Sequence, residues 1–206
     1  MRTPRRTLAP AVAALFCLLI AGMAGLARAD EKKPAAPMAA AAPASGFRAD
    51  FLFLFDDVAK KLTDLAQAMP AEKYGWRPAE GVRSVGEVYA HIAGANFFIP
   101  KAWGAEPELG GVDIKALQTA ATDKGKVTEA LSKSLANVRH AVERMSDADL
   151  DRPIDLFGHK ATVRAAVLVV GNHMHEHLGQ SIAYARMNGV VPPWTAAEEH
   201  AAPRKP

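Results

Sequence analysis

The sequence predicts an all-α protein, an up-and-down four-helix bundle, because four segments repeat apolar residues at helical spacing and none alternates with the period of two typical of strands. Of the 206 residues, about 150 lie between two Pro-containing terminal segments, which is enough to bury one sizeable core. Four amphipathic helices in a stretch of that length are typical of a bundle. Two connections, residues 74–83 and 104–123, are long, and the second is long enough to cross an end of the bundle.

The first two predicted helices have clear apolar stripes and clear ends. The first covers residues 47–69 and ends before Pro70, because proline cannot continue a helix. The second covers residues 84–100 and opens with a Ser-x-x-Glu capping box formed by Ser84 and Glu87. The residues expected to face the core in these two helices are Phe47, Phe51, Leu54, Val58, Leu62, Leu65, Met69, Val88, Ile92, Ala95 and Ile99.

The third and fourth predicted helices differ in how much of their surface is apolar. The third covers residues 124–145, and its many charged residues predict one solvent-exposed face. The fourth starts near Thr162, a good N-cap residue, and ends at Asn188-Gly189 before two prolines. It is apolar on several sides, so we expect it to be the most buried of the four.

Both ends of the chain are predicted to lie outside the bundle, which we place at residues 47–194. Residues 1–29 combine basic residues, a short apolar run and an Ala-Arg-Ala ending, the order of a cleaved signal peptide rather than a membrane-spanning helix. Residues 30–46 are Ala/Pro-rich and predict a flexible spacer. Residues 195–206 are polar and Pro-containing, and we expect a disordered tail.

A cleaved signal peptide predicts a periplasmic or secreted protein with no stable membrane insertion. Arg5-Arg6 also fits a twin-arginine signal, but Pro4 stands where such signals usually have Ser or Thr, so we favour the secretory route. Cleavage removes four arginines, leaving 21 of the 25 basic residues against 22 acidic ones, a net charge of −1. That balance gives no support for nucleic-acid binding. The only cysteine, Cys17, leaves with the signal, so neither disulfides nor thiol chemistry are expected.

Histidines supply the candidate chemistry. His173 and His177 are four residues apart in the fourth predicted helix and therefore share one face, whereas His175 points away. Two imidazoles at this spacing can bind one divalent metal ion. The spacing alone also fits a pair of surface or hydrogen-bonded core histidines. His91 borders the buried stripe of the second predicted helix and offers a third donor.

These residues occur in two blocks that resemble the DinB-like (DinB/YfiT-like) family of metal-dependent proteins. The first block is residues 73–87 (KYGWRPAEGVRSVGE) leading to His91, and the second runs from the H-x-x-x-H of His173 and His177 to Pro193. The resemblance covers nearly the whole mature domain and implies a four-helix bundle. It also implies one divalent metal ion, usually zinc or nickel, held by His91, His173 and His177.

Three protein nitrogens leave an open coordination position for water or a small-molecule substrate, which is typical of a catalytic site. The resemblance implies a metal-dependent hydrolase or transferase, since some members transfer low-molecular-weight thiols or are mycothiol-dependent isomerases. Thiols are not kept reduced outside the cytoplasm, so an exported member favours hydrolysis or plain metal binding. The alternatives are a non-enzymatic metal-binding or stress-associated module and an interaction domain without a metal. Family members often dimerise, so a homodimer is possible.

Other residues near the histidines have weaker assignments. Glu176 lies about 60° from His173 on the helical wheel and is a candidate catalytic base, although a solvated role is equally compatible with its position. Gln180 and Tyr184 follow on a similar face and could contact substrate, fix a histidine tautomer or simply pack. We expect the other domain histidines to be exposed and the tryptophans to be packing residues; these are His140, His159, His175, Trp76, Trp103 and Trp194.

Overall fold

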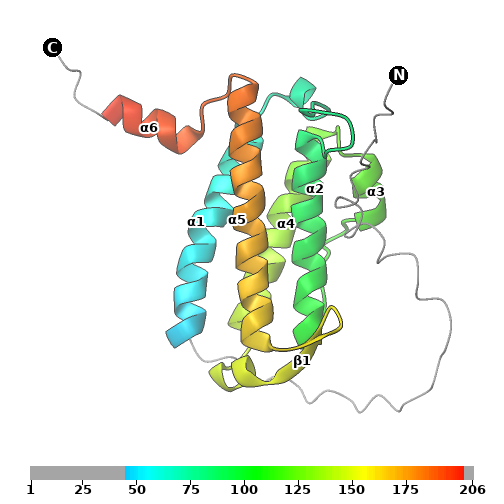
Figure 1. The fold of residues 1–206 in the computed structure, drawn as a ribbon, viewed down its shortest axis with the longest axis vertical. Helices are drawn as coiled ribbons and strands as arrows, with labels where there is room; N and C mark the ends of the chain where they lie inside the picture. The colour runs from blue at the N-terminus through cyan, green and yellow to red at the C-terminus, as the bar shows by residue number, and fades with distance from the viewer. Residues whose placement is uncertain (1–44, 202–206) are drawn as a thin grey trace, which may run out of the picture. The chain divides into compact units, whose positions relative to one another are not determined.

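The computed structural model describes residues 45–201, which all belong to one compact unit. The described part is mostly helical, with four long helices (Figure 1). These are α1 (Gly46–Ala68), α2 (Val85–Phe98), α4 (Lys124–Glu143) and α5 (Val163–Met187). The predicted signal peptide and residues 30–44 of the predicted spacer lie outside the described residues. None of the described helices is long and apolar enough to cross a membrane.

Side-chain caps set the starts of the helices much as the sequence predicts. The Ser84 hydroxyl accepts from the backbone N–H of Glu87, whose carboxylate accepts from the Ser84 N–H at 2.7 Å, so the capping box of α2 is present. Helices α4 and α5 are capped by Asp123 and Thr162, whose side chains each accept a hydrogen bond from the backbone N–H three residues further along the chain. At the other end of α5, Gly189 adopts a left-handed φ of 74°, a conformation that costs glycine little.

Neighbouring helices do not alternate strictly in direction, so the predicted up-and-down order is wrong at one step. Gly86, at the start of α2, lies against Ala121, just before α4. Near the end of α2, Asn96 bonds Ser134 at 3.3 Å, and Asn137 donates to the Asn96 carbonyl at 2.9 Å. α2 and α4 therefore run parallel, because the chain returns along the bundle before α4 begins.

The return path is the long connection between α2 and α4. It contains the 3-10 helix η3 (Ile99–Trp103) and the short helix α3 (Ile114–Thr119). α3 lies beside α2 and α4 (Figure 1). The length of this connection was visible in the sequence, but its course along the helices, rather than across one end, was not.

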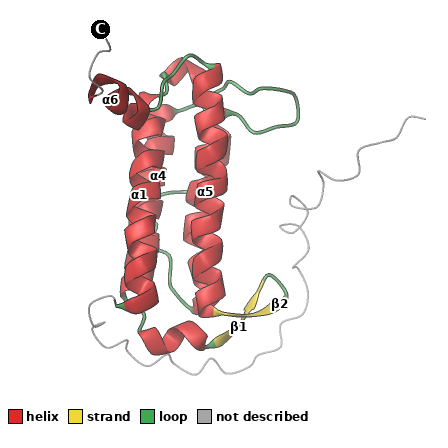
Figure 2. Ribbon diagram, turned by 60° about the vertical axis from the view of Figure 1, so that its left-hand side comes forward, coloured by secondary structure: helices red, strands yellow, loops and turns green. Residues whose placement is uncertain are grey.

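The structure contains a β-hairpin and a sixth α-helix that the sequence did not predict (Figure 2). Strands β1 (Pro153–Leu156) and β2 (His159–Thr162) pair antiparallel, although we expected no strand. Four residues are too few for a period of two to stand out. Residues 195–201 of the predicted tail belong to helix α6 (Pro193–Ala201). Proline is favoured in the first turn of a helix, and Trp194 packs near Lys61 of α1.

The core is formed by the facing stripes of the four long helices, and it includes nearly all the predicted apolar positions. Leu54 is an exception, with 58% of its surface exposed, and Phe55 takes its place at 3%. Phe55 lies about 40° around the helix from Phe51, within the face that also carries Val58 and Leu62, whereas Leu54 lies about 60° to the other side, at the edge of that face. The central part of α5 is buried against α1 and α2, which positions its histidines.

Candidate metal centre

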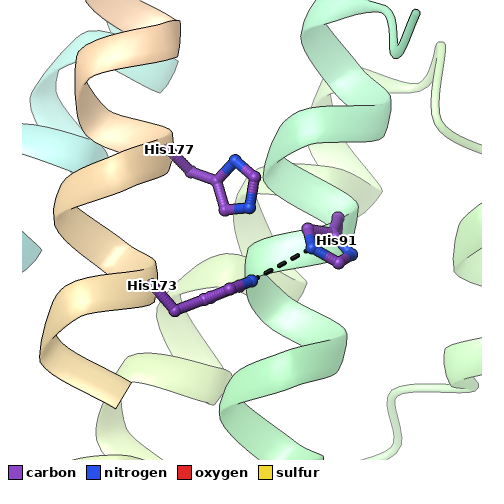
Figure 3. Close-up of side chains that lie close together, drawn as sticks. All are labelled: His91, His173 and His177. Carbon is purple, nitrogen blue, oxygen red and sulfur yellow. Dashed lines mark hydrogen bonds between the residues drawn. The ribbon is translucent and has the colours of Figure 1, made fainter. Parts of the chain in front are cut away.

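Two neighbouring helices bring three predicted site residues to one point. His91 lies in the middle of α2, and His173 and His177 lie one turn apart in α5. Figure 3 shows the three imidazoles pointing toward one another across the gap between the two helices. Because α2 and α5 are both fixed by core packing, the convergence of the rings is a property of the fold rather than of one flexible loop.

The spacing of the ring nitrogens suits a single bound ion. The Nε2 atoms of His91 and His173 are 3.0 Å apart, and one nitrogen from each of the three rings lies within 4.8 Å of the others. Two nitrogens bound to a tetrahedral zinc ion at 2.0–2.1 Å would be about 3.3 Å apart. The three side chains therefore need only small rotations to share one cation.

Burial keeps the imidazoles of His91 and His173 in the form that binds metal. His177 is 6% exposed, and His91 and His173 are half-buried. Burial, and to a smaller extent the charges of Arg83 and the other two histidines, lowers the pKa of His91 to about 3. Burial, followed by His177 and Arg83, lowers the pKa of His173 to about 4. Both rings are therefore neutral at pH 7, with a lone pair available for a ligand bond.

The surroundings of the cluster are polar on the α5 side. His177 Nδ1 lies 2.9 Å from the Gln180 side-chain oxygen, and the Gln180 amide nitrogen donates to the Tyr184 hydroxyl at 3.0 Å. The Tyr184 ring meets the edge of Trp76 at a centroid distance of 5.4 Å. Of the two ring nitrogens of His173, Nδ1 is buried and has no hydrogen-bond partner within residues 45–201.

Glu176 does not join the histidines. Its side chain is exposed, and among the described acidic and histidine residues only His91, His173 and His177 form the cluster. Position 176 is about 100° around the helix from His177, so a side chain there points away from the direction that the two ligand rings share. Glu176 is therefore not among the candidate metal ligands, and its role as a catalytic base stays a prediction.

The other histidines lie elsewhere, as expected. His175 is exposed and bonds the Gly171 carbonyl, His140 pairs with Glu108 at 2.8 Å, and His159 is exposed on strand β2. Each of them therefore has a local or solvent environment that is separate from the cluster.

One functionally relevant residue was not singled out from the sequence. Arg83 is half-buried, and its positive charge acts on His91 and His173. It directly precedes the N-cap Ser84. Its closeness to His91 in the sequence was the only feature that could have pointed to a place near the site. Since α5 supplies the other two histidines, the proximity of Arg83 to the site required the tertiary structure.

Chemically, the cluster offers three imidazole nitrogen donors and leaves room in a divalent ion's coordination shell for a further ligand. Imidazole suits zinc, nickel, copper and iron more than magnesium or calcium, which prefer oxygen. Within the described residues no carboxylate belongs to the cluster, so the donor set is purely histidine.

Comparisons with known proteins agree with this geometry. The sequence profile of the DinB superfamily matches residues 54–181, a range that contains all three histidines. A DinB-like protein from Bacillus cereus ATCC 10987 is 22% identical, with a TM-score of 0.63 over 69% of this chain and 93% of that one. A DinB-like protein from Bacillus subtilis, YjoA, is 23% identical, with a TM-score of 0.50 over 69% and 94%. No curated protein matches the sequence.

Proposed function

Because the chain belongs to the DinB superfamily, we propose that the cluster of three histidines is a binding site for one divalent metal ion, zinc or nickel. The observation that carries this proposal is the convergence of three imidazoles, two of whose Nε2 atoms lie 3.0 Å apart. In this proposal His91, His173 and His177 are the ligands, and at least one coordination position stays open for water or a substrate atom.

We further propose metal-dependent hydrolysis or group transfer on a small molecule. A bound divalent ion would lower the pKa of a ligand water toward neutrality and polarise a substrate oxygen. The chain's own contribution is to fix three donors on two packed helices and to keep His91 and His173 neutral by burial.

The proposed setting is the periplasm or the extracellular space, after removal of residues 1–29. The signal-like order of these residues supports this proposal. N-terminal sequencing of protein recovered from the exported fraction tests it, with Asp30 as the expected first residue. An intact N-terminus in the cytoplasmic fraction would contradict it.

Elemental analysis tests the metal site directly. The protein is purified without a histidine tag or chelator, beside a His173→Ala/His177→Ala variant and a control, His159→Ala/His175→Ala, that removes two exposed histidines. We expect about one equivalent of zinc or nickel in the wild type and in the control, and loss of the metal in the cluster variant. Equal metal content in all three proteins, or none after excess ion is added at neutral pH, would refute the site.

A second candidate function is a non-enzymatic metal-binding module, which the same three-histidine donor set also fits. The two candidates differ in whether the fourth position is open. Cobalt(II) in place of the native ion gives a visible spectrum that reports the coordination shell. A spectrum that changes when azide is added indicates an exchangeable position and favours catalysis, whereas an unchanged spectrum indicates a closed shell and favours metal binding alone.

A further inference from the structure

Gln180 contacts one of the three cluster histidines directly. It lies one turn beyond His177 on α5, and its side-chain oxygen is 2.9 Å from His177 Nδ1. Gln180 is half-buried and His177 is buried, so water competes little for this contact. A metal ligand usually has a hydrogen-bond partner on its second ring nitrogen, and such partners orient the ring and fix its tautomer.

The direction of this hydrogen bond decides which nitrogen of His177 can bind metal. An amide oxygen only accepts, so a neutral His177 must carry its proton on Nδ1 and keep the lone pair on Nε2. If the amide were turned around, its NH₂ group would face Nδ1. The proton would then sit on Nε2 and block that nitrogen from a cation. The orientation of one amide therefore controls the availability of one donor.

A second contact holds the Gln180 side chain in place, with its oxygen toward His177. The Gln180 amide nitrogen donates to the Tyr184 hydroxyl at 3.0 Å. Tyr184 is 7% exposed, and its ring packs edge-on against Trp76. Trp76 is tied to the start of α2, because its carbonyl accepts from the Val85 N–H at 3.0 Å. The tyrosine is thus fixed by a segment outside α5.

We propose that Gln180 is a positioning residue, held by Tyr184, that keeps His177 in the Nδ1–H tautomer and so presents Nε2 to the metal. The link to metal binding rests on the proposed function, whereas the tautomer itself is a property of the metal-free protein. The full path runs from Trp76 through Tyr184 and Gln180 to His177.

The tautomer is measured first, on metal-free protein at pH 7, by two-bond ¹H–¹⁵N correlation spectra of the histidine rings. We expect His177 to carry its proton on Nδ1 in the wild type and in Gln180→Glu, which keeps an oxygen acceptor. We expect that preference to be lost in Gln180→Leu, which has no acceptor. A wild-type His177 protonated on Nε2, or an unchanged tautomer in Gln180→Leu, would overturn the proposal.

Zinc affinity, measured by competition with a chromophoric chelator, is the second readout. Gln180→Leu should weaken binding about tenfold to a hundredfold, Tyr184→Phe should weaken it less, and Gln180→Glu should retain it. Gln67→Leu is the matched control, because Gln67 is an exposed glutamine on α1. Wild-type affinity in Gln180→Leu would overturn the proposal. If the wild type binds no zinc at all, the proposed metal site fails, and the tautomer spectra alone decide the role of Gln180.

Discussion

Gly86 allows the start of α2 to lie directly against the backbone that leads into α4. A Cβ atom at this position would come within 1.7 Å of the Ala121 carbonyl oxygen and within 3.0 Å of the Tyr74 ring. Ordinary contact begins near 3.4 Å, so the Gly86→Ala substitution requires backbone to move by roughly 1.7 Å. The Gly86 N–H also donates to the Tyr74 carbonyl at 2.9 Å, which resists such a movement.

The sign of the effect follows from two opposing terms. Alanine in a helix interior is favoured over glycine by about 1 kcal/mol. Forcing extra volume into a packed site costs about 1–3 kcal/mol and more when backbone must shift. Because the atoms in the way belong to backbone, we expect the second term to win and Gly86→Ala to lower the free energy of unfolding by about 2–4 kcal/mol.

Gly94→Ala is the matched control in the same helix. The nearest atom to a Cβ there is in the Ile114 side chain at 3.9 Å, so only the helix propensity acts, and we expect a gain of about 0.5–1 kcal/mol. Urea unfolding followed by circular dichroism, with a chelator present so that metal does not contribute, measures both variants. If Gly86→Ala is as stable as Gly94→Ala, the close approach of α2 to residues 120–121 is wrong.

Three further predictions concern an ion pair, a charge near the metal centre and the core. Asp147→Asn should lower stability at pH 7, because Arg48 donates to this carboxylate at 2.7 Å and is itself 2% exposed. The Arg48 hydrogen bond holds the pKa of Asp147 below its usual value, so the difference between variant and wild type in urea midpoint should persist above about pH 4 and shrink as the pH falls below it. Arg83→Gln should raise zinc affinity on the order of a few-fold and reduce its salt dependence, because a positive charge near the site is removed; unchanged affinity in chelator competition would contradict this. Met174→Ala should cost about 2–5 kcal/mol in urea unfolding because its side chain is fully buried, whereas Met187→Ala, at a position 63% exposed, should change stability by less than about 0.5 kcal/mol; equal effects would refute the packing of α5.

The local signals in the sequence predicted most helix starts and ends correctly. Ser84 and Glu87 form the expected capping box, and Thr162 caps α5. These features depend on contacts within three or four residues, so they follow from the order of residues in the chain. The spacing of His173 and His177 belongs to the same class, because one helical turn places both on one face wherever the helix packs.

The hairpin turn and the long-range packing of the helices were harder to predict. The hairpin turn at Phe157 and Gly158 uses two positive φ angles without the Asn-Gly or Asp-Gly pair that usually signals such a turn. The parallel course of α2 and α4 depends on how residues 99–123 pack along the bundle, which no local pattern specifies.

The sequence by itself determined the helical class, the ends of the long helices and a pair of histidines on one helix face, because each is encoded within a few turns of chain. The resemblance of residues 73–91 to a known family nominated His91 as their partner. Only the tertiary structure decided that His91 reaches that pair, that burial keeps the rings of His91 and His173 neutral, and that Gln180 and Tyr184 support His177. These depend on the antiparallel packing of α2 against α5, where segments 82 residues apart in the chain meet.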